Sequence, residues 1–117
     1  MQIHLFDKDK DAELFAARHT IFKAGDPGEL MFAVLEGEVD IIINGKTVES
    51  VGPGGVFGEM ALIEDRPRVA AAVVKSAARI VPVDRKRFMF LVQQNPFFAL
   101  QLMAIMAARL RRMNAEL

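Results

Sequence analysis

The sequence has 117 residues, enough for one domain with its own core, and 52 % of them are hydrophobic, which argues against a disordered chain. Fifteen Lys and Arg residues balance fifteen Asp and Glu residues, so net charge gives no reason to expect nucleic acid or an anionic membrane as a partner. The absence of cysteine excludes disulfides, iron–sulfur clusters and thiol chemistry.

Targeting signals are the next point to consider. No uninterrupted apolar run reaches about 18 residues, the length that indicates a transmembrane helix. The N-terminal residues 1–14, MQIHLFDKDKDAEL, lack the basic start and apolar middle of a signal peptide. We therefore expect no membrane segment and a cytoplasmic location, and Met1 with its charged leader is typical of a natural start.

Short apolar runs separated by turn residues fill the chain up to about residue 83. Asn44-Gly45 is a strong two-residue hairpin signal, and Pro27 with Gly28 marks an earlier turn. Regularly spaced short strands are typical of a small barrel or jelly roll. We predict strands at residues 20–23, 30–35, 39–43, 46–51, 69–74 and 79–83.

The periodicity becomes helical after residue 83. Asp84 is a suitable N-cap for a helix over residues 84–94. Asn95 followed by Pro96 predicts a second helix start, and nothing interrupts helix formers from 96 to 117. We expect a single domain over 1–117, with a barrel at about 14–83 and helices at about 84–94 and 96–117.

Residues 57–74, FGEMALIEDRPRVAAAVV, place two charged side chains among small apolar ones. A tight helical turn after Gly58 would present free backbone N–H groups to an anion, and Arg68 could add bidentate hydrogen bonds to a phosphate. Glu59 would repel a phosphate but could accept from a sugar hydroxyl. The pattern thus allows a sugar-phosphate site, while a structural Glu59–Arg68 ion pair is the alternative.

This segment resembles the phosphate-binding cassette of the cyclic nucleotide-binding domain family. Residues 57–62 (FGEMAL) and 67–70 (PRVA) match the family pattern F-G-E-[LM]-A-L, a short loop, then P-R-x-A. Residues 25–41 resemble an upstream family stretch, and the resemblance covers about residues 14–117. The family includes catabolite activator proteins, regulatory subunits of cyclic-nucleotide-dependent kinases, and cyclic-nucleotide-gated channels.

The resemblance implies a mostly β fold, an eight-stranded jelly-roll barrel with C-terminal helices as a lid. It implies that Arg68 holds the cyclic phosphate and that Glu59 accepts from the ribose 2′-hydroxyl. Backbone N–H groups of Ala61 and Val69, with Gly58 nearby, would complete the phosphate cradle. The other cassette residues expected at the ligand are Met60, Leu62 and Ala70.

The residue after the arginine bears on nucleotide selectivity. Members of the family that prefer cGMP often carry Thr or Ser there, whose hydroxyl can reach guanine, whereas this chain has Val69. We therefore expect cAMP as the ligand in preference to cGMP. Without a hydroxyl at residue 69 or 71, affinity would depend more on Arg68 and the backbone.

The last helix has two faces that could serve different purposes. One carries Phe98, Leu102, Ile105 and Arg109, and we expect Arg109 to stack on or hydrogen-bond the purine. The other follows heptad spacing and could pair with a second copy of the chain. Its candidate dimer residues are Met103, Met106, Leu110, Met113 and Leu117.

The expected function is a non-catalytic cyclic nucleotide sensor whose last helix closes over the barrel and signals to an unknown effector. Alternatives are the sensor part of a longer activator or channel, and a ligand-free dimerisation domain. The chain has no helix-turn-helix after the long helix, so we expect no DNA-binding element in it. A jelly-roll metalloenzyme would need a histidine-rich metal set, and His4 and His19 do not supply one.

Overall fold

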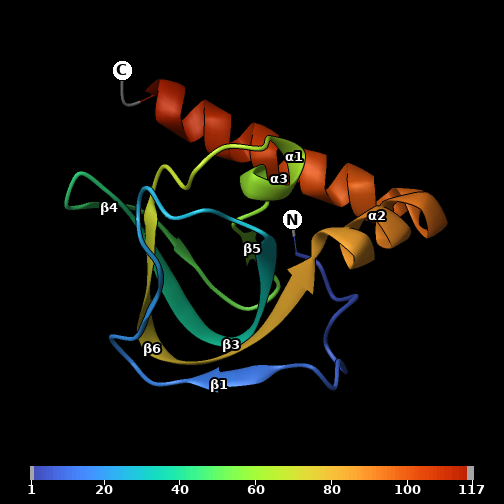
Figure 1. Ribbon diagram of the computed structural model, residues 1–117, viewed down its shortest axis with the longest axis horizontal. Coiled ribbons are helices and arrows are strands. Elements are labelled where there is room, and N and C mark those ends of the chain that lie inside the picture. The colour runs from blue at the N-terminus through green and yellow to red at the C-terminus, as the bar shows by residue number, and fades with distance from the viewer. Residues whose placement is uncertain (1, 116–117) are drawn as a thin grey trace.

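The computed structural model describes residues 2–115, and within that range it contains six strands and three helices (Figure 1). The strands are β1 (Glu13–Phe15), β2 (Thr20–Phe22), β3 (Leu30–Ile43), β4 (Lys46–Val51), β5 (Val56–Phe57) and β6 (Ala71–Asp84). The helices are α1 (Met60–Ile63), α2 (Arg85–Gln94) and α3 (Pro96–Ala115). The expected mostly β fold with C-terminal helices is confirmed.

Two strands of 14 residues each, β3 and β6, form the centre of the sheet and pair antiparallel over most of their length. Register shifts between Val34 and Val39 bend the pair, as β-bulges do. Gly37 lies at this bend with φ +81°, where a Cβ would collide with the backbone of Ala77 on β6. The sheet order is β1-β6-β3-β4, while β2 pairs with β6 and β5 with β3.

The eight-stranded closed barrel is not confirmed, because the described residues form six strands in a sheet that does not close. The strands expected at 30–35 and 39–43 are parts of β3, and most of those expected at 69–74 and 79–83 belongs to β6. Gly37 interrupts the apolar pattern of β3, and residues 75–78 interrupt that of β6. The bulges nevertheless leave the backbone pairing of the two strands continuous. The short strands β1 and β5 were not predicted.

The local signals for turns and helix starts are confirmed. Asn44 and Gly45 form the two-residue loop between β3 and β4, and Asn44 has φ +51°. Asp84 caps α2 by accepting from the Arg87 backbone N–H at 2.8 Å. Asn95 accepts from the Phe98 N–H at 3.3 Å at the start of α3. Each signal is local, which explains why the sequence alone predicts it well.

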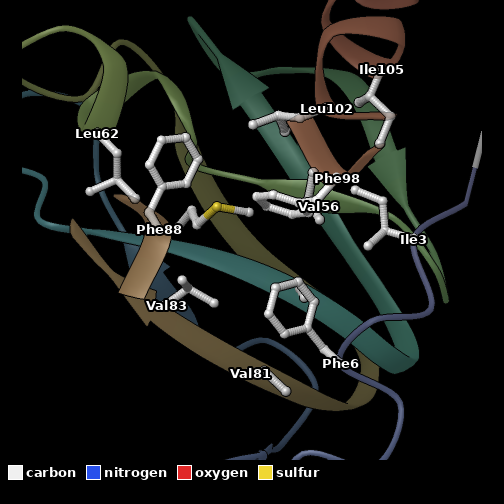
Figure 2. Close-up of a cluster of buried hydrophobic side chains, with 12 residues drawn as sticks. Ile3, Phe6, Val56, Leu62, Val81, Val83, Phe88, Phe98, Leu102 and Ile105 are labelled. Atoms are coloured by element: carbon white, nitrogen blue, oxygen red, sulfur yellow. The ribbon is translucent and has the colours of Figure 1, made fainter. Parts of the chain in front are cut away.

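Buried hydrophobic residues form two clusters. The sheet core consists of side chains from β3, β4, β5 and β6. Its members are Phe32, Val34, Val39, Val51, Phe57, Ala72, Val74, Ala78 and Ile80. The helix-side core joins the sheet to the helices and contains Ile3, Phe6, Met31, Ala33, Val56, Leu62, Val81, Val83, Phe88, Phe98, Leu102 and Ile105 (Figure 2). The inner face of α3 is therefore part of the core.

The N-terminal segment belongs to the helix-side core, although it precedes the first strand. Ile3 and Phe6 are buried, and the Phe6 ring meets the Phe98 ring edge-on at 6.0 Å between centroids. Arg87 of α2 lies over the Phe6 ring and donates a hydrogen bond to the Asp9 carboxylate. The segment thus attaches α2 and α3 to the sheet.

We expect Asp9→Asn to lower the free energy of unfolding at pH 7 by about 1–2 kcal/mol. The hydrogen bond from Arg87 holds the pKa of the Asp9 carboxyl below its usual value of 3.8, although burial acts in the opposite direction. Because the folded-state pKa is depressed, this stabilisation is present above pH 3.8 and is lost as the pH falls through the folded-state pKa. Urea unfolding at pH 7 and pH 3 measures the difference.

The control for this prediction is Asp11→Asn. The Asp11 carboxylate is 77 % exposed and lies 3.9 Å from Arg87, so its loss should change stability little. Equal losses in the two variants at pH 7 would contradict the assignment to Asp9.

No single helix within residues 2–115 is long and apolar enough to cross a membrane. Residues 85–94 and 96–112 pass that test only when taken together, and they meet at a bend of 112°.

Candidate functional site

The sequence 57–62 forms the tight turn that the pattern predicts. Gly58 has φ +78°, and α1 begins two residues later as a single helical turn. Glu59 occupies the N-cap position, and its backbone carbonyl accepts from the N–H groups of Leu62 and Ile63. This turn places the Glu59 side chain inside the molecule, where it is 3 % exposed.

Arg68 crosses from the loop after α1 to the turn before β3. Its guanidinium donates to the carbonyl oxygens of Gly58 at 2.8 Å and Leu30 at 2.5 Å. The same group lies over the Phe22 ring, 4.1 Å from the centroid. A Cβ at Gly28 would lie 2.7 Å from Arg68 Nε, so the turn needs glycine there to admit the side chain. The guanidinium is thus held in one position by backbone and ring.

The positive charge of Arg68 is poorly compensated. Arg68 Nε is buried without a hydrogen-bond acceptor, and the other two nitrogens donate to neutral carbonyls. Burial lowers the pKa of Arg68 from its usual value, and the more distant charges of Glu59 and Asp26 offset this only in part. A held, partly buried cation with a free donor is suited to an anionic ligand.

Glu59 forms its ion pair with Arg109 of α3. Arg109 Nη1 donates to Glu59 Oε1 at 2.6 Å, Nε donates to Glu49 Oε1 at 2.8 Å, and Nη2 donates to the Val56 carbonyl. Arg112 adds a 3.3 Å contact to Glu49. All three nitrogens of Arg109 therefore have partners, on β4, on β5 and at the N-cap of α1.

The two arginines differ in how their charge is balanced. Burial alone would lower the pKa of Arg109, but the charges and hydrogen bonds of Glu59 and Glu49 outweigh it and raise the pKa above its usual value. Among the described residues no ion pair joins Glu59 to Arg68, so the structural pair considered as an alternative is formed by Arg109 instead. Of these two arginines, Arg68 is the one without a carboxylate in direct contact.

The other cassette residues differ in how much of each is exposed to solvent. Ala61, Leu62 and Ala70 are buried, whereas Met60 is 45 % and Val69 is 76 % exposed. The structure thus brings Gly58, Glu59 and Arg68 together with Arg109, and leaves Val69 facing outward. The stacking of Arg109 on a purine stays a prediction, since its guanidinium here lies against the two carboxylates.

A groove of about 730 Å³ lies beside this cluster, between the last turns of α3 and the turn after β4. Of the site residues predicted from the sequence, only Arg109 lines it. Glu49, Ser50 and Ile105 also contribute to its walls. The groove therefore adjoins the Arg109 end of the cluster and not the Arg68 end.

Sequence reasoning did not identify three residues that complete the site. Glu49 belongs to the strand predicted at 46–51, and only the fold brings it to Arg109, 60 residues later. Gly28 was read as a turn glycine, although its lack of a side chain makes room for Arg68. Arg85 is the first of three consecutive basic residues, and although it is exposed it donates to the carbonyl oxygens of Leu62 at 2.7 Å and Ala61 at 3.2 Å.

Known proteins are similar to this chain in sequence and fold. The chain is 31 % identical over 108 residues to a CRP-like cAMP-activated global transcriptional regulator of Mycobacterium tuberculosis, covering 88 % of this chain and 48 % of the regulator. The crystal structure of the Thermus thermophilus catabolite activator protein matches with a TM-score of 0.79 and 31 % identity, over 90 % of this chain and 52 % of that one. The chain thus spans about half the length of these relatives.

A kinase regulatory domain is also similar. The co-crystal structure of the regulatory domain of Toxoplasma gondii PKA with cAMP matches at a TM-score of 0.62 and 33 % identity, over 66 % of this chain and 31 % of that one. The family model described as the cyclic nucleotide-binding domain matches residues 12–95, which include Glu59 and Arg68. This chain therefore belongs to the cyclic nucleotide-binding domain family.

Proposed function

We propose that this chain is a non-catalytic regulatory module that binds cAMP in preference to cGMP. The cyclic phosphate would be held by Arg68 and the N–H groups of Ala61 and Val69, and the ribose 2′-hydroxyl would donate to Glu59. Two of the relatives named above support the ligand: the Mycobacterium tuberculosis regulator is described as cAMP-activated, and the Toxoplasma gondii regulatory domain, which matches this fold, was solved with cAMP. What the module regulates depends on an effector that the chain's own residues do not identify.

The observation that carries the proposal is the uncompensated cation at Arg68. A cyclic phosphate carries one negative charge, which would restore the balance that burial disturbs at this guanidinium. Its oxygen atoms would also supply the acceptor that Arg68 Nε lacks. Glu59 uses Oε1 for Arg109, so Oε2 can accept from a ribose hydroxyl without breaking that ion pair.

Calorimetric titration of nucleotide-stripped protein with cAMP and then cGMP tests this function. We expect saturable binding of cAMP with a Kd of about 1 μM or below. A Kd of this size corresponds to a binding free energy of about −8 kcal/mol. Stripping matters because a tight ligand can survive purification and mask the site. A folded protein that binds neither nucleotide would refute the proposal and would favour a ligand-free interaction domain.

We expect Val69→Thr to narrow the preference for cAMP over cGMP. Val69 is 76 % exposed beside Arg68 and has no hydroxyl, whereas threonine could hydrogen-bond the guanine amino group. A hydrogen bond of about 1 kcal/mol corresponds to roughly fivefold in cGMP affinity. The same titrations measure the ratio of the two affinities, and Val48→Thr on β4, 41 % exposed and outside residues 57–74, serves as the control. Equal cAMP and cGMP affinities in the starting protein would remove the selectivity claim.

We also propose that nucleotide binding holds α3 more firmly on the sheet, as a lid. The helix already packs there through Phe98, Leu102 and Ile105, and Arg109 connects it to Glu59. A ligand can shift this contact only by binding one arrangement of α3 better than another. The lid proposal thus depends on Glu59 serving the ribose and Arg109 at once.

The outer face of α3 is a candidate homodimer surface. Met103 and Leu110 are both 61 % exposed, and Met106 is partly buried. The remaining candidates, Met113 and Leu117, lie outside the residues whose side chains the structure describes. We expect light scattering at micromolar protein to give twice the chain mass, and Met103→Glu with Leu110→Glu to restore the monomer. A monomeric parent protein would contradict the dimer proposal.

A cytoplasmic location also belongs to the proposed function and is tested by cell fractionation.

A further inference from the structure

The groove beside Arg109 has room for the base of the proposed ligand. Its volume of about 730 Å³ falls within the range of about 300–1,000 Å³ that is usual for small-molecule sites. Glu59 lies between the other two charges of the site, because it acts on Arg68 through its charge and bonds directly to Arg109, which borders the groove. A phosphate at Arg68 and a ribose at Glu59 therefore leave the purine to lie toward the groove.

Glu49 of β4 presents an unused acceptor in this groove. Its side chain lines the groove and is 16 % exposed. Oε1 accepts from Arg109 Nε at 2.8 Å and lies 3.3 Å from Arg112 Nη2, whereas no donor among the described side chains reaches Oε2. Each carboxylate oxygen has two lone pairs. The two arginines therefore occupy Oε1, and Oε2 can still accept a hydrogen bond.

Arg109 holds the carboxylates of Glu49 and Glu59 on one guanidinium. Its Nε donates to Glu49 and its Nη1 donates to Glu59. Because a guanidinium is planar and rigid, it keeps the two carboxylates at a fixed spacing. The free oxygen of Glu59 would serve the ribose, so the free oxygen of Glu49 is available to the next part of the same ligand, the base.

The other polar side chains that line the groove have different roles. Its three arginines can only donate hydrogen bonds. The Ser50 hydroxyl donates to the Asp40 carboxylate at 2.6 Å. The Gln2 amide donates to the Pro53 carbonyl at 3.3 Å. Among the described lining residues, Glu49 is therefore the one that offers a free carboxylate oxygen to a donor on the ligand.

We propose that Glu49 recognises the base: its Oε2 accepts a hydrogen bond from the 6-amino group of adenine and so selects cAMP over cGMP. The inference rests on the proposed function, since it concerns the same ligand. Guanine carries a carbonyl oxygen at position 6, and two acceptors that face each other repel. Guanine turned to present its N1–H and 2-amino groups would need both carboxylate oxygens, and Oε1 is held by Arg109 and Arg112.

Calorimetric titration with an analogue of cAMP tests this contact. The analogue is the 3′,5′-cyclic phosphate of purine riboside, which differs from cAMP by the absence of the 6-amino group. We expect the wild-type protein to bind the analogue about tenfold more weakly than cAMP. In Glu49→Ala the two ligands should bind equally, because the acceptor is gone. A purely structural role of Glu49 would weaken both ligands and leave their ratio unchanged.

Glu49→Gln tests the selectivity with a side chain of the same shape. Its amide oxygen can keep the hydrogen bond from Arg109, which leaves the NH₂ group to face the base. That donor matches the guanine carbonyl and opposes the adenine amino group, so we expect the ratio of cAMP to cGMP affinity to fall at least about tenfold. The control is Glu36→Gln, whose carboxylate is 67 % exposed and lies 3.6 Å from Arg79, and it should keep the wild-type ratio.

The outcomes separate this inference from the proposed function. If the wild-type protein binds cAMP and the analogue equally, or if the Glu49 variants keep the wild-type ratios, Glu49 does not recognise the base while the sensor function stands. The first of these results needs no variant, so it holds even if a substitution prevents folding. If the wild-type protein binds neither cAMP nor cGMP, the sensor function fails and the role of Glu49 fails with it.

Discussion

Arg68→Leu should lower the affinity for cAMP by about 100-fold or more while the domain still folds. Charge-assisted hydrogen bonds to a phosphate are worth about 1.5–3 kcal/mol, and the variant also removes the only charge proposed to hold the phosphate. Leucine can keep the contact with the Phe22 ring, although the carbonyls of Gly58 and Leu30 lose their donor. Calorimetric titration gives the affinity, and circular dichroism with thermal unfolding checks the fold.

Arg66→Leu is the matched control for this variant. Arg66 lies two residues earlier, is 80 % exposed, and approaches only Glu64 at 3.6 Å among the described acidic residues. Its loss removes the same charge from the same loop but should leave the affinity within about twofold. Wild-type binding by Arg68→Leu would show that the phosphate site lies elsewhere.

Arg109→Ala should be the most destabilising of the substitutions considered, with a loss of about 3–5 kcal/mol. Its removal leaves the Glu59 carboxylate, 5 % exposed, without a cation in direct contact, and leaves Glu49, 16 % exposed, with the Arg112 contact alone. For a domain of this size such a loss corresponds to a fall in Tm of roughly 10–20 °C. Thermal unfolding followed by circular dichroism measures it, and nucleotide affinity should fall as well.

Two further variants show whether the loss comes from unpaired charge. Arg111→Ala removes an exposed arginine from the same helix and should shift Tm by only a degree or two. Adding Glu49→Gln and Glu59→Gln to Arg109→Ala should recover a large part of the lost stability, because no buried carboxylate then lacks a partner. A Tm of Arg109→Ala close to that of the wild type would mean that the ion pairs are loosely formed in solution.

The accuracy of the sequence-based predictions depends on the range of the interactions. The Asn44-Gly45 hairpin, the Asp84 cap and the helix start at Pro96 each depend on neighbours within about four residues, and all three are confirmed. The number of strands was less predictable. Whether Gly37 ends a strand or bends one depends on the pairing of β3 with β6, which no local pattern reveals.

The same distinction holds at the site. The sequence predicted that Glu59 and Arg68 belong to one ligand site, with an ion pair between them as the alternative, and the fold brings both residues into one region. The ion pair that Glu59 forms is with Arg109, 50 residues later, and Glu49 lies 60 residues before the same arginine. A sequence shows that charges are balanced overall, but the choice of partner follows from how α3 packs on the sheet.

The position of β6 in the sheet also has a consequence for synthesis of the chain. Of the strands in residues 2–115, β6 leaves the ribosome after all the others, yet β1, β2 and β3 all pair with it, and Glu13 lies opposite Ile80. The β3–β4 hairpin can form early from neighbouring residues, whereas β1 and β2 must wait for more than fifty further residues. Such distant pairings fold slowly, because loop-closure entropy is lost before the contacts form. The nascent chain therefore exposes its apolar strands until residue 84 has emerged, and this is the stage at which it is most open to aggregation or to a chaperone.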